Sequence, residues 1–226
     1  MTTIAENLQG VRARIARAAQ AARRDPATVT LLAVSKTHSV ASIEQARAAG
    51  QNAFGENYVQ DAAPKMAALP HLEWHLIGAL QSNKTRSAAE QFDWIQTVDR
   101  EKIARRLSDQ RPLHRPPLNV LIQINISAET SKSGVIPEEA GALAQALAAL
   151  PRLRLRGLMA IPHPQRDTAA QFRAMQALYE RLAPQFGLDT LSMGMSDDLE
   201  AAIAHGATMV RVGTAIFGPR KVELRA

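Results

Sequence analysis

The feature that most constrains the fold is a regular alternation of short apolar segments with longer helix-like segments. Eight segments are short, apolar and rich in β-branched residues, as expected of strands that are covered on both faces. They begin near Val29, Gln51, Glu73, Asp93, Asn119, Leu155, Asp189 and Met209. The stretches between them are rich in Ala, Leu, Arg and Glu, for example residues 137–150 and 165–186. This alternation indicates a parallel sheet with right-handed crossovers.

Eight strands favour a closed barrel over an open, doubly wound sheet of five or six strands. A single-domain (β/α)8 TIM barrel typically takes about 250 residues, so a chain of 226 residues would be a lean version. No linker rich in Gly, Ser or Pro interrupts the sequence, and we therefore predict one α/β domain over residues 1–226. Only seven helical segments fall between the strands, so we expect an extra N-terminal helix, within residues 1–28, to pack on the barrel.

Several classes of protein are disfavoured by the composition. The chain has no cysteine, which removes disulfides, thiolate metal sites and cysteine nucleophiles. The six histidines show neither an HExxH motif nor close pairing, so no metal site is predicted. The charged N-terminus lacks the apolar region of a signal peptide, and no apolar run approaches the roughly 20 residues of a membrane span. We therefore expect a cytoplasmic protein with no membrane partner.

A net charge of +6 leaves room for an anionic partner. The densest basic cluster lies on an amphipathic N-terminal segment and comprises Arg12, Arg14, Arg17, Arg23 and Arg24. This cluster is either the solvated face of an outer helix or an RNA-binding strip. We favour the solvated face and predict no nucleic-acid partner.

Lys36 ends the apolar run LLAVSK. By strand alternation it points the same way as Leu32 and Val34, into the predicted barrel. An ammonium at an apolar barrel mouth is partly desolvated, which lowers its pKa and frees the amine as a nucleophile. Such a lysine suits Schiff-base chemistry with an aldehyde. The alternative is a lysine whose stem lies on apolar surface while its ammonium reaches solvent.

The segments after strands seven and eight are the frequent phosphate site of this architecture. Gly194 permits a tight turn, and Ser196 is placed to cap a helix that starts near Asp197, where free N–H groups favour an anion. At the end of strand eight, Gly213 lets a ligand approach the backbone and Thr214 adds a hydroxyl. An ordinary N-cap and an ordinary strand-end glycine are the alternatives.

Arg211 shares the parity of Gly213, so we expect its side chain to point into the barrel. A buried guanidinium needs a partner, which is either a pyridine nitrogen or a barrel carboxylate. Because arginine stays protonated, it would leave such a nitrogen unprotonated. Three nearby acidic residues oppose a phosphate unless they face outward: Asp197, Asp198 and Glu200.

Eight motifs in order along the chain resemble the pyridoxal phosphate homeostasis proteins. The motifs are LLAVSKT, FGENYVQ, WHLIGALQSNK, NVLIQINIS, SKSG, LRGLMAIP, LSMGMSDDLEAAI and MVRVGTAIFG. The resemblance covers residues 31–218 and is specific, because eight ordered motifs of this length do not recur by chance. It implies a fold like the N-terminal barrel of alanine racemase and pyridoxal 5′-phosphate (PLP) as the cofactor.

The resemblance also assigns the residues around that cofactor. It makes Lys36 the Schiff-base lysine, places Arg211 at the pyridine nitrogen and Asn57 beside the cofactor, and implies three phosphate ligands: Ser196, Gly213 and Thr214. Two positions depart from the family pattern, with His38 where a second lysine often stands and Ala79 where His or Pro is common. His38 puts a transfer role of that second lysine in doubt, and Lys132 follows strand five with no assigned role.

The function implied by the resemblance is that of a cytoplasmic, usually monomeric carrier. Such a protein buffers PLP or delivers it to PLP-dependent apoenzymes, and influences amino- and keto-acid metabolism. The alternative, a small amino-acid racemase, needs a second base opposite the lysine, which related racemases take as a tyrosine from a C-terminal β-domain. The chain ends at Ala226, so we expect that domain to be absent and assign no catalytic residue. Tyr58 and Tyr179 are the only tyrosines, and neither is a good candidate for that base.

Overall fold

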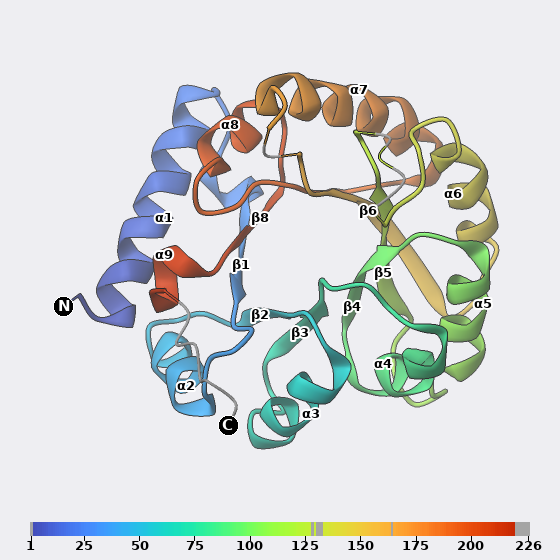
Figure 1. Ribbon diagram of the computed structural model, residues 1–226, viewed down its shortest axis with the longest axis horizontal. Helices are drawn as coiled ribbons and strands as arrows, with labels where there is room; N and C mark the ends of the chain where they lie inside the picture. Colours follow the sequence, from blue (N-terminus) through green and yellow to red (C-terminus); the bar gives the residue numbers. More distant parts are fainter. Residues whose placement is uncertain (1, 128, 130–132, 164, 220–226) are drawn as a thin grey trace.

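The computed structural model describes residues 2–127, 129, 133–163 and 165–219, which form a closed parallel barrel (Figure 1). Its strands follow the chain order from β1 to β8, and β8 closes the barrel by pairing with β1. The predicted (β/α)8 barrel is confirmed. The strands are β1 (Thr30–Val34), β2 (Ala53–Glu56), β3 (Glu73–Leu76), β4 (Trp94–Val98), β5 (Leu118–Ile124), β6 (Leu153–Ala160), β7 (Thr190–Ser192) and β8 (Met209–Val212).

The helices form a ring around the barrel, as Figure 1 shows. Two elements are short 3-10 helices: η1 (Pro26–Thr28), which precedes β1, and η2 (Ser82–Lys84), which lies between β3 and α4. The α-helices are α1 (Ile4–Ala21), α2 (Val40–Ala48), α3 (Val59–Ala68), α4 (Thr85–Gln91), α5 (Glu101–Gln110), α6 (Ala140–Ala148), α7 (Thr168–Phe186), α8 (Leu199–Ala204) and α9 (Thr214–Phe217).

Helix α1 completes the outer ring beside the last strand. A capping box formed by Thr3 and Glu6 starts the helix. The stripe Leu8, Val11 and Ile15 is buried, and the helix packs against α8, α9 and α2. The first helix of the chain therefore joins the end of the barrel to its beginning.

The basic cluster on α1 is more than a solvated helix face. Arg12 donates hydrogen bonds to the carbonyls of Ala49 and Gly50 at the end of α2, at 2.8 and 2.9 Å. Arg24 donates to the carbonyl of Ile203 in α8 at 2.8 Å. Arg12 is exposed, as expected of a solvated face, and it also ties α1 to α2, while Arg24 ties the segment after α1 to α8.

Strand two begins two residues later than the apolar pattern suggested. Gln51 precedes the strand and is buried, and its side-chain amide donates to the carbonyls of Leu31 and Ala53 at 2.8 and 2.9 Å. Gln51 is therefore buried because its side chain binds the backbone of two strands, and this burial makes the segment resemble a strand. The residue itself precedes β2. Elsewhere, no helix in the described part of the chain has the length and apolar character needed to cross a bilayer.

The barrel interior is filled by apolar side chains and also by polar ones. One interior cluster comprises Trp94, Leu121 and Met159, and a second joins Leu32, Ala53 and Met209, with Ile77 against it. Four polar side chains are buried as well: His75, Gln96, Ser192 and Arg211. Buried polar groups are costly unless they are hydrogen-bonded, so the partners of these four matter for the site described next.

Candidate functional site

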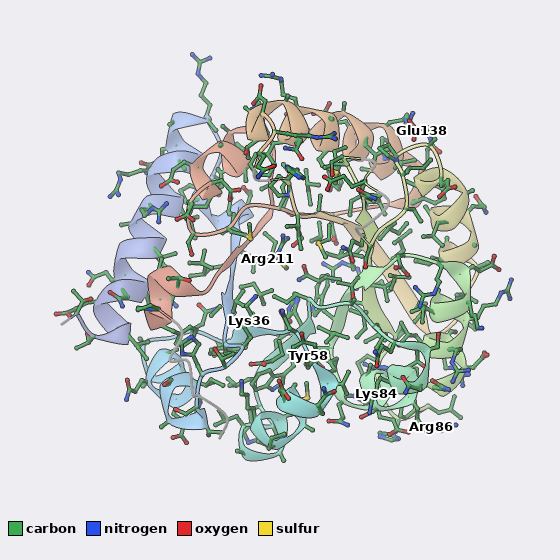
Figure 2. The ribbon with its side chains drawn as sticks, viewed as in Figure 1. Lys36, Tyr58, Lys84, Arg86, Glu138 and Arg211 are labelled. Carbon is green, nitrogen blue, oxygen red and sulfur yellow. The ribbon has the colours of Figure 1, made fainter. Side chains whose placement is uncertain are left out.

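A pocket of about 480 Å³ opens at the carboxyl ends of the strands. All six residues singled out from the sequence line this pocket: Lys36, Asn57, Ser196, Arg211, Gly213 and Thr214. Figure 2 shows Lys36 beside the end of β1 and Arg211 nearer the centre of the ring, whereas Lys84 and Arg86 lie farther out by α4. The carboxyl end of the strands is where barrels of this type carry their functional groups.

Lys36 lies in a tight turn that follows β1. The amide of His38 donates to the carbonyl of Ser35 at 3.0 Å, which closes the turn. Thr37 has a φ of 67°, in the left-handed region that β-branched residues avoid. This half-buried lysine therefore projects from a constrained backbone and not from a loose loop.

A buried ion pair between Lys65 and Glu56 holds the backbone of Ser35, the residue before Lys36. The ammonium of Lys65, from α3, donates to the carbonyl of Ser35 at 2.9 Å and to Oε1 of Glu56 at 2.8 Å. The hydroxyl of Ser35 donates to the same carboxylate oxygen at 2.5 Å. The sequence analysis missed Lys65, although its signal is visible: it shares the buried stripe of α3 with Val59 and Met66.

The segment after β7 differs from its prediction in one respect. Helix α8 begins at Leu199 with Asp198 as its N-cap residue, so the expected N-cap role of Ser196 is wrong. Gly194 has a φ of 94°, and a Cβ there would lie 2.5 Å from the Cβ of Ala202. The turn therefore requires glycine, and it leaves Ser196 in the wall of the pocket instead of at the end of a helix.

The three acidic residues of this segment have different surroundings. Glu200 is paired with Arg14 of α1, whose guanidinium lies 2.7 Å from one carboxylate oxygen and 2.9 Å from the other. The Arg14 hydrogen bond lowers the pKa of Glu200. Asp198 accepts a hydrogen bond from the amide of Met195 at 2.5 Å, and burial raises its pKa. Only Asp197 lines the pocket.

Arg14 is a pocket residue that the sequence analysis assigned to a solvated helix face. Its Nη2 also donates to the carbonyl of Ser196 at 2.8 Å, and its side chain lines the pocket. Arg14 is more than 180 residues away in the sequence from Ser196 and Glu200, so sequence periodicity gives no signal for this contact. With Lys36 and Arg211 it gives the pocket three cationic side chains against the single carboxylate of Asp197.

The glycine at the end of β8 has a packing role. A Cβ at Gly213 would lie 3.2 Å from the carbonyl oxygen of Val34 and 3.3 Å from its Cβ. Glycine therefore favours the close approach of β8 to β1, whether or not a ligand also approaches its backbone. The single-turn helix α9 starts at the next residue, Thr214, and the amides of Ile216 and Phe217 donate to the carbonyl of Gly213 at 2.9 and 3.0 Å.

Arg211 is buried, with 4% of its surface exposed, and burial lowers its pKa to about 10. Its Nη1 donates to Oγ of Ser192 at 2.8 Å, and its Nη2 donates to the carbonyl of Ala160 at 2.9 Å. Within the described residues it forms no salt bridge with a carboxylate, which was the alternative to a ligand. A guanidinium carries five N–H donors, so this buried cation has donors left for a group in the pocket.

The remaining residues named from the sequence lie around this pocket or outside it. His38 stacks on Phe217 with ring centroids 4.7 Å apart. Ala79 lines a separate pocket of about 310 Å³ with Tyr58 and Lys84. Lys132 lies outside the described residues. Across the part of the chain that the structure describes, no group of three or more His, Cys, Asp or Glu residues is placed to hold a metal ion.

The chemistry of the pocket follows from these groups. It places a lysine amine, a buried guanidinium and hydroxyl groups around one cavity with a surplus of positive charge. A matching ligand is a small molecule with a carbonyl that reacts with an amine, a hydrogen-bond acceptor facing Arg211, and an anionic group near Ser196 and Thr214.

The comparisons with known proteins agree with this geometry. Residues 7–221 match the family described as alanine racemase, N-terminal domain. The pyridoxal phosphate homeostasis protein of Pseudomonas aeruginosa is 61% identical over 223 residues, covering 97% of each chain. The structure of PipY from Synechococcus elongatus with PLP bound has a TM-score of 0.80 at 41% identity, covering 96% of this chain and 100% of PipY. Alanine racemase from Corynebacterium glutamicum shares the fold, with a TM-score of 0.73 at 20% identity over 99% of this chain and 62% of the racemase.

Proposed function

The chain belongs to the pyridoxal phosphate homeostasis proteins, within the alanine racemase N-terminal domain family, and on that premise we propose that it is a PLP carrier. In this proposal Lys36 holds PLP as a Schiff base, and the monomeric protein releases the cofactor to PLP-dependent apoenzymes in the cytoplasm. Control of free PLP would then influence amino- and keto-acid metabolism. The observation that carries the proposal is that the six residues named from the sequence, which follow β1 and β2 or belong to β8 and the segments after β7 and β8, line one pocket.

The residues of the pocket fit the three chemical features of PLP. When bound, PLP supplies an aldehyde that condenses with an amine and a pyridine ring that accepts electrons. The amine of Lys36 adds to the aldehyde carbon and water leaves. Arg211 donates a hydrogen bond to the pyridine nitrogen, and Ser196, Gly213 and Thr214 hold the phosphate. Asn57 would lie beside the ring, and Arg14, whose charge is paired with Glu200, would help to hold Ser196 in place through its carbonyl.

A carrier is favoured over a racemase by the positions of the tyrosines. Neither tyrosine of the chain is among the residues that line the Lys36 pocket. Tyr58 is 58% exposed and lines the neighbouring pocket. The hydroxyl of Tyr179, on α7, donates to the carbonyl of Leu188 at 3.0 Å. A second base opposite Lys36, which racemisation requires, is therefore not supplied by a tyrosine of this chain.

The site assignment is tested by trapping the cofactor. Purified protein incubated with PLP should show the absorbance band of a Schiff base, and borohydride reduction followed by peptide mapping should find the cofactor on Lys36. Lys36→Ala should lose the band, while Lys84→Ala, at an exposed lysine beside the neighbouring pocket, should keep it. An unchanged band in Lys36→Ala would refute the site.

The carrier role is tested by transfer. The PLP-loaded protein is mixed with a PLP-dependent apoenzyme in the presence of an excess of a protein that traps free PLP. We expect the apoenzyme to gain activity faster than it does from the same amount of free PLP under the same trap. If the trap abolishes activation by the PLP-loaded protein as fully as it abolishes activation by free PLP, the carrier role is refuted. The protein would then bind PLP without delivering it directly.

A further inference from the structure

A continuous row of hydrogen bonds runs from Arg211 through the barrel interior to the opposite end of the barrel. Nη1 of Arg211 contacts Oγ of Ser192 at 2.8 Å, and that hydroxyl contacts Oε1 of Gln96 at 2.7 Å. Nε2 of Gln96 contacts Nδ1 of His75 at 2.9 Å. Nε2 of His75 then contacts Oε1 of Glu73 at 2.8 Å. The row links four strands, and its Gln96–Ser192 bond joins β4 to β7, which are not neighbours in the sheet.

The two ends of this row fix the direction of every hydrogen bond in it. The guanidinium of Arg211 only donates, and an ionised carboxylate such as Glu73 only accepts. The hydroxyl of Ser192 accepts from Arg211, so it donates to Gln96. Gln96 therefore accepts through its oxygen and donates through its nitrogen, which leaves Nδ1 of His75 as an acceptor.

The same logic assigns the proton of the buried histidine. With Nδ1 accepting, the neutral ring of His75 carries its proton on Nε2 and donates it to Glu73. The second N–H of the Gln96 amide is used as well, because it contacts the sulfur of Met209 at 3.2 Å. The polar atoms that link the row are therefore satisfied with one consistent set of protons.

Burial makes this arrangement rigid. His75, Gln96 and Ser192 are each 0% exposed, and His75 stacks on Trp94 with ring centroids 5.0 Å apart and planes at 8°. Burial lowers the pKa of His75, which keeps the ring neutral, and the hydrogen bond from His75 lowers the pKa of Glu73, which keeps it ionised. Polar networks in a low-dielectric interior stiffen the structure when every member is satisfied.

We propose that Glu73, His75 and Gln96 are positioning residues that orient Arg211 for the cofactor, an inference that rests on the proposed function. Through Ser192 they hold the guanidinium in one orientation, so that its remaining N–H donors face the pocket. Without Gln96, the hydroxyl of Ser192 loses its acceptor and can rotate to other orientations. Its lone pair then no longer stays directed at Nη1 of Arg211, and the guanidinium is held less firmly. The three residues do not line the pocket and act only through Arg211.

The first test needs no cofactor. The ¹⁵N spectrum of the histidine rings in the PLP-free protein distinguishes a protonated ring nitrogen from an unprotonated one. We expect His75, assigned by its loss in His75→Gln, to carry its proton on Nε2 at neutral pH. A proton on Nδ1, or a ring protonated on both nitrogens, would overturn the proposed direction of the row.

The second test measures the effect on the cofactor. Gln96→Met removes the polar link at similar volume, and Met159→Leu is the control because Met159 lies in the apolar cluster of the same barrel interior. We expect Gln96→Met to bind PLP about tenfold more weakly, as loss of one charge-assisted hydrogen bond would do. The ¹⁵N shift of the pyridine nitrogen in labelled PLP should also move. Met159→Leu should change neither.

The outcomes separate this inference from the proposed function. A wild-type Schiff-base band together with Gln96→Met values equal to those of Met159→Leu would overturn the positioning role alone. A wild-type protein that forms no such band would overturn the proposed function, and with it any role of the row toward PLP. If Gln96→Met does not fold, the histidine spectrum of the wild-type protein still decides the direction of the row.

Discussion

Arg111 and Arg211 are both buried arginines, but they lie at opposite ends of the barrel and differ in their partners. Burial lowers the pKa of each to about 10. Arg111 ends α5 before β5 and donates to three backbone carbonyls, those of Ala89, Phe92 and Pro116, at 2.7–2.9 Å. Arg211 donates to one carbonyl and one hydroxyl and lines the pocket of about 480 Å³ that also holds Lys36, whereas Arg111 lines a smaller pocket of about 230 Å³ with Asp93, Pro116 and Asn119.

The same contrast extends to the charged groups around each arginine. At the end of the barrel where the strands begin, Arg156 lies 2.8 Å from Asp189 and Arg115 lies 2.9 Å from Asp93. At the other end, Arg211 forms no salt bridge among the described residues, although the carboxylate of Asp197 lines the same pocket. A cation whose hydrogen bonds are spent on backbone and carboxylates holds loops together. Arg211 has fewer backbone partners than Arg111, and its unused donors lie in the pocket that also holds Lys36, which indicates a ligand there.

The largest expected effect is on stability, from Arg111→Met. This change leaves the buried carbonyls of Ala89 and Phe92 without their donor, and each buried, unsatisfied acceptor costs about 1–3 kcal/mol. We expect the free energy of unfolding in urea to fall by about 3 kcal/mol, while the PLP dissociation constant of the folded protein stays within about twofold. Arg105→Met, at a side chain that is 63% exposed, should cost less than about 0.5 kcal/mol. Equal losses in the two variants would show that Arg111 does not brace this end.

The second expected effect is on PLP binding, from Arg211→Met, with a smaller effect on stability. Replacing Arg211 removes the desolvation cost of a buried charge, which offsets part of the cost of leaving the carbonyl of Ala160 and the hydroxyl of Ser192 without a donor. We therefore expect the PLP-free protein to lose only about 1 kcal/mol, less than Arg111→Met. The hydrogen bond to the pyridine nitrogen is lost, and PLP should bind roughly 30-fold more weakly, or about 2 kcal/mol. Spectrophotometric titration of PLP and urea unfolding of the same samples measure the two quantities. A large loss of stability with unchanged PLP affinity would remove the distinction between the two arginines.

The sequence predicts the mouth of the barrel better than its interior. Strand ends are visible from periodicity, and parallel strands bring their carboxyl ends to one edge, which is why six residues spread from Lys36 to Thr214 line one pocket. Arg14 was missed because its place depends on how α1 packs against α8. Ser196 was misassigned because the turn at Gly194 places the helix start later, at Asp198.

The interior row was missed for a different reason, since its members come from strands that are far apart in the sequence. A signal was nevertheless present in two strand segments. His75 in EWHLIG and Gln96 in DWIQTV are polar residues in the middle of strands that the apolar pattern assigns to a fully covered sheet. Polar residues at such positions need partners, but the pattern does not say which ones. Only the closed barrel brings Gln96 of β4 to Ser192 of β7.

The smallest expected effect concerns pH and the end of the row where the strands begin. Burial lowers the pKa of His75 below its ordinary value of about 6.5. The unfolded chain then takes up a proton near pH 6.5 that the folded chain does not, so the free energy of unfolding falls as the pH falls below that value. The slope for this group is at most about 1.4 kcal/mol per pH unit. It is fully developed before Glu73 begins to contribute, because the unfolded glutamate takes up its proton only near pH 4.5.

His75→Gln keeps a polar side chain in the row but removes the titrating ring, which makes it the matched variant for this prediction. Urea unfolding at several pH values between about 7 and 5 should give a steeper loss of stability for the wild-type protein than for His75→Gln. The difference should survive with PLP absent, because His75 contacts Gln96 and Glu73 and not the pocket. Parallel curves would mean that His75 takes up a proton over the same pH range in the folded and unfolded chains, which is incompatible with a ring held neutral by burial with Nδ1 accepting from Gln96. The pH dependence thus tests, by a route independent of cofactor binding, whether the hydrogen bonds that hold Arg211 run in a single direction.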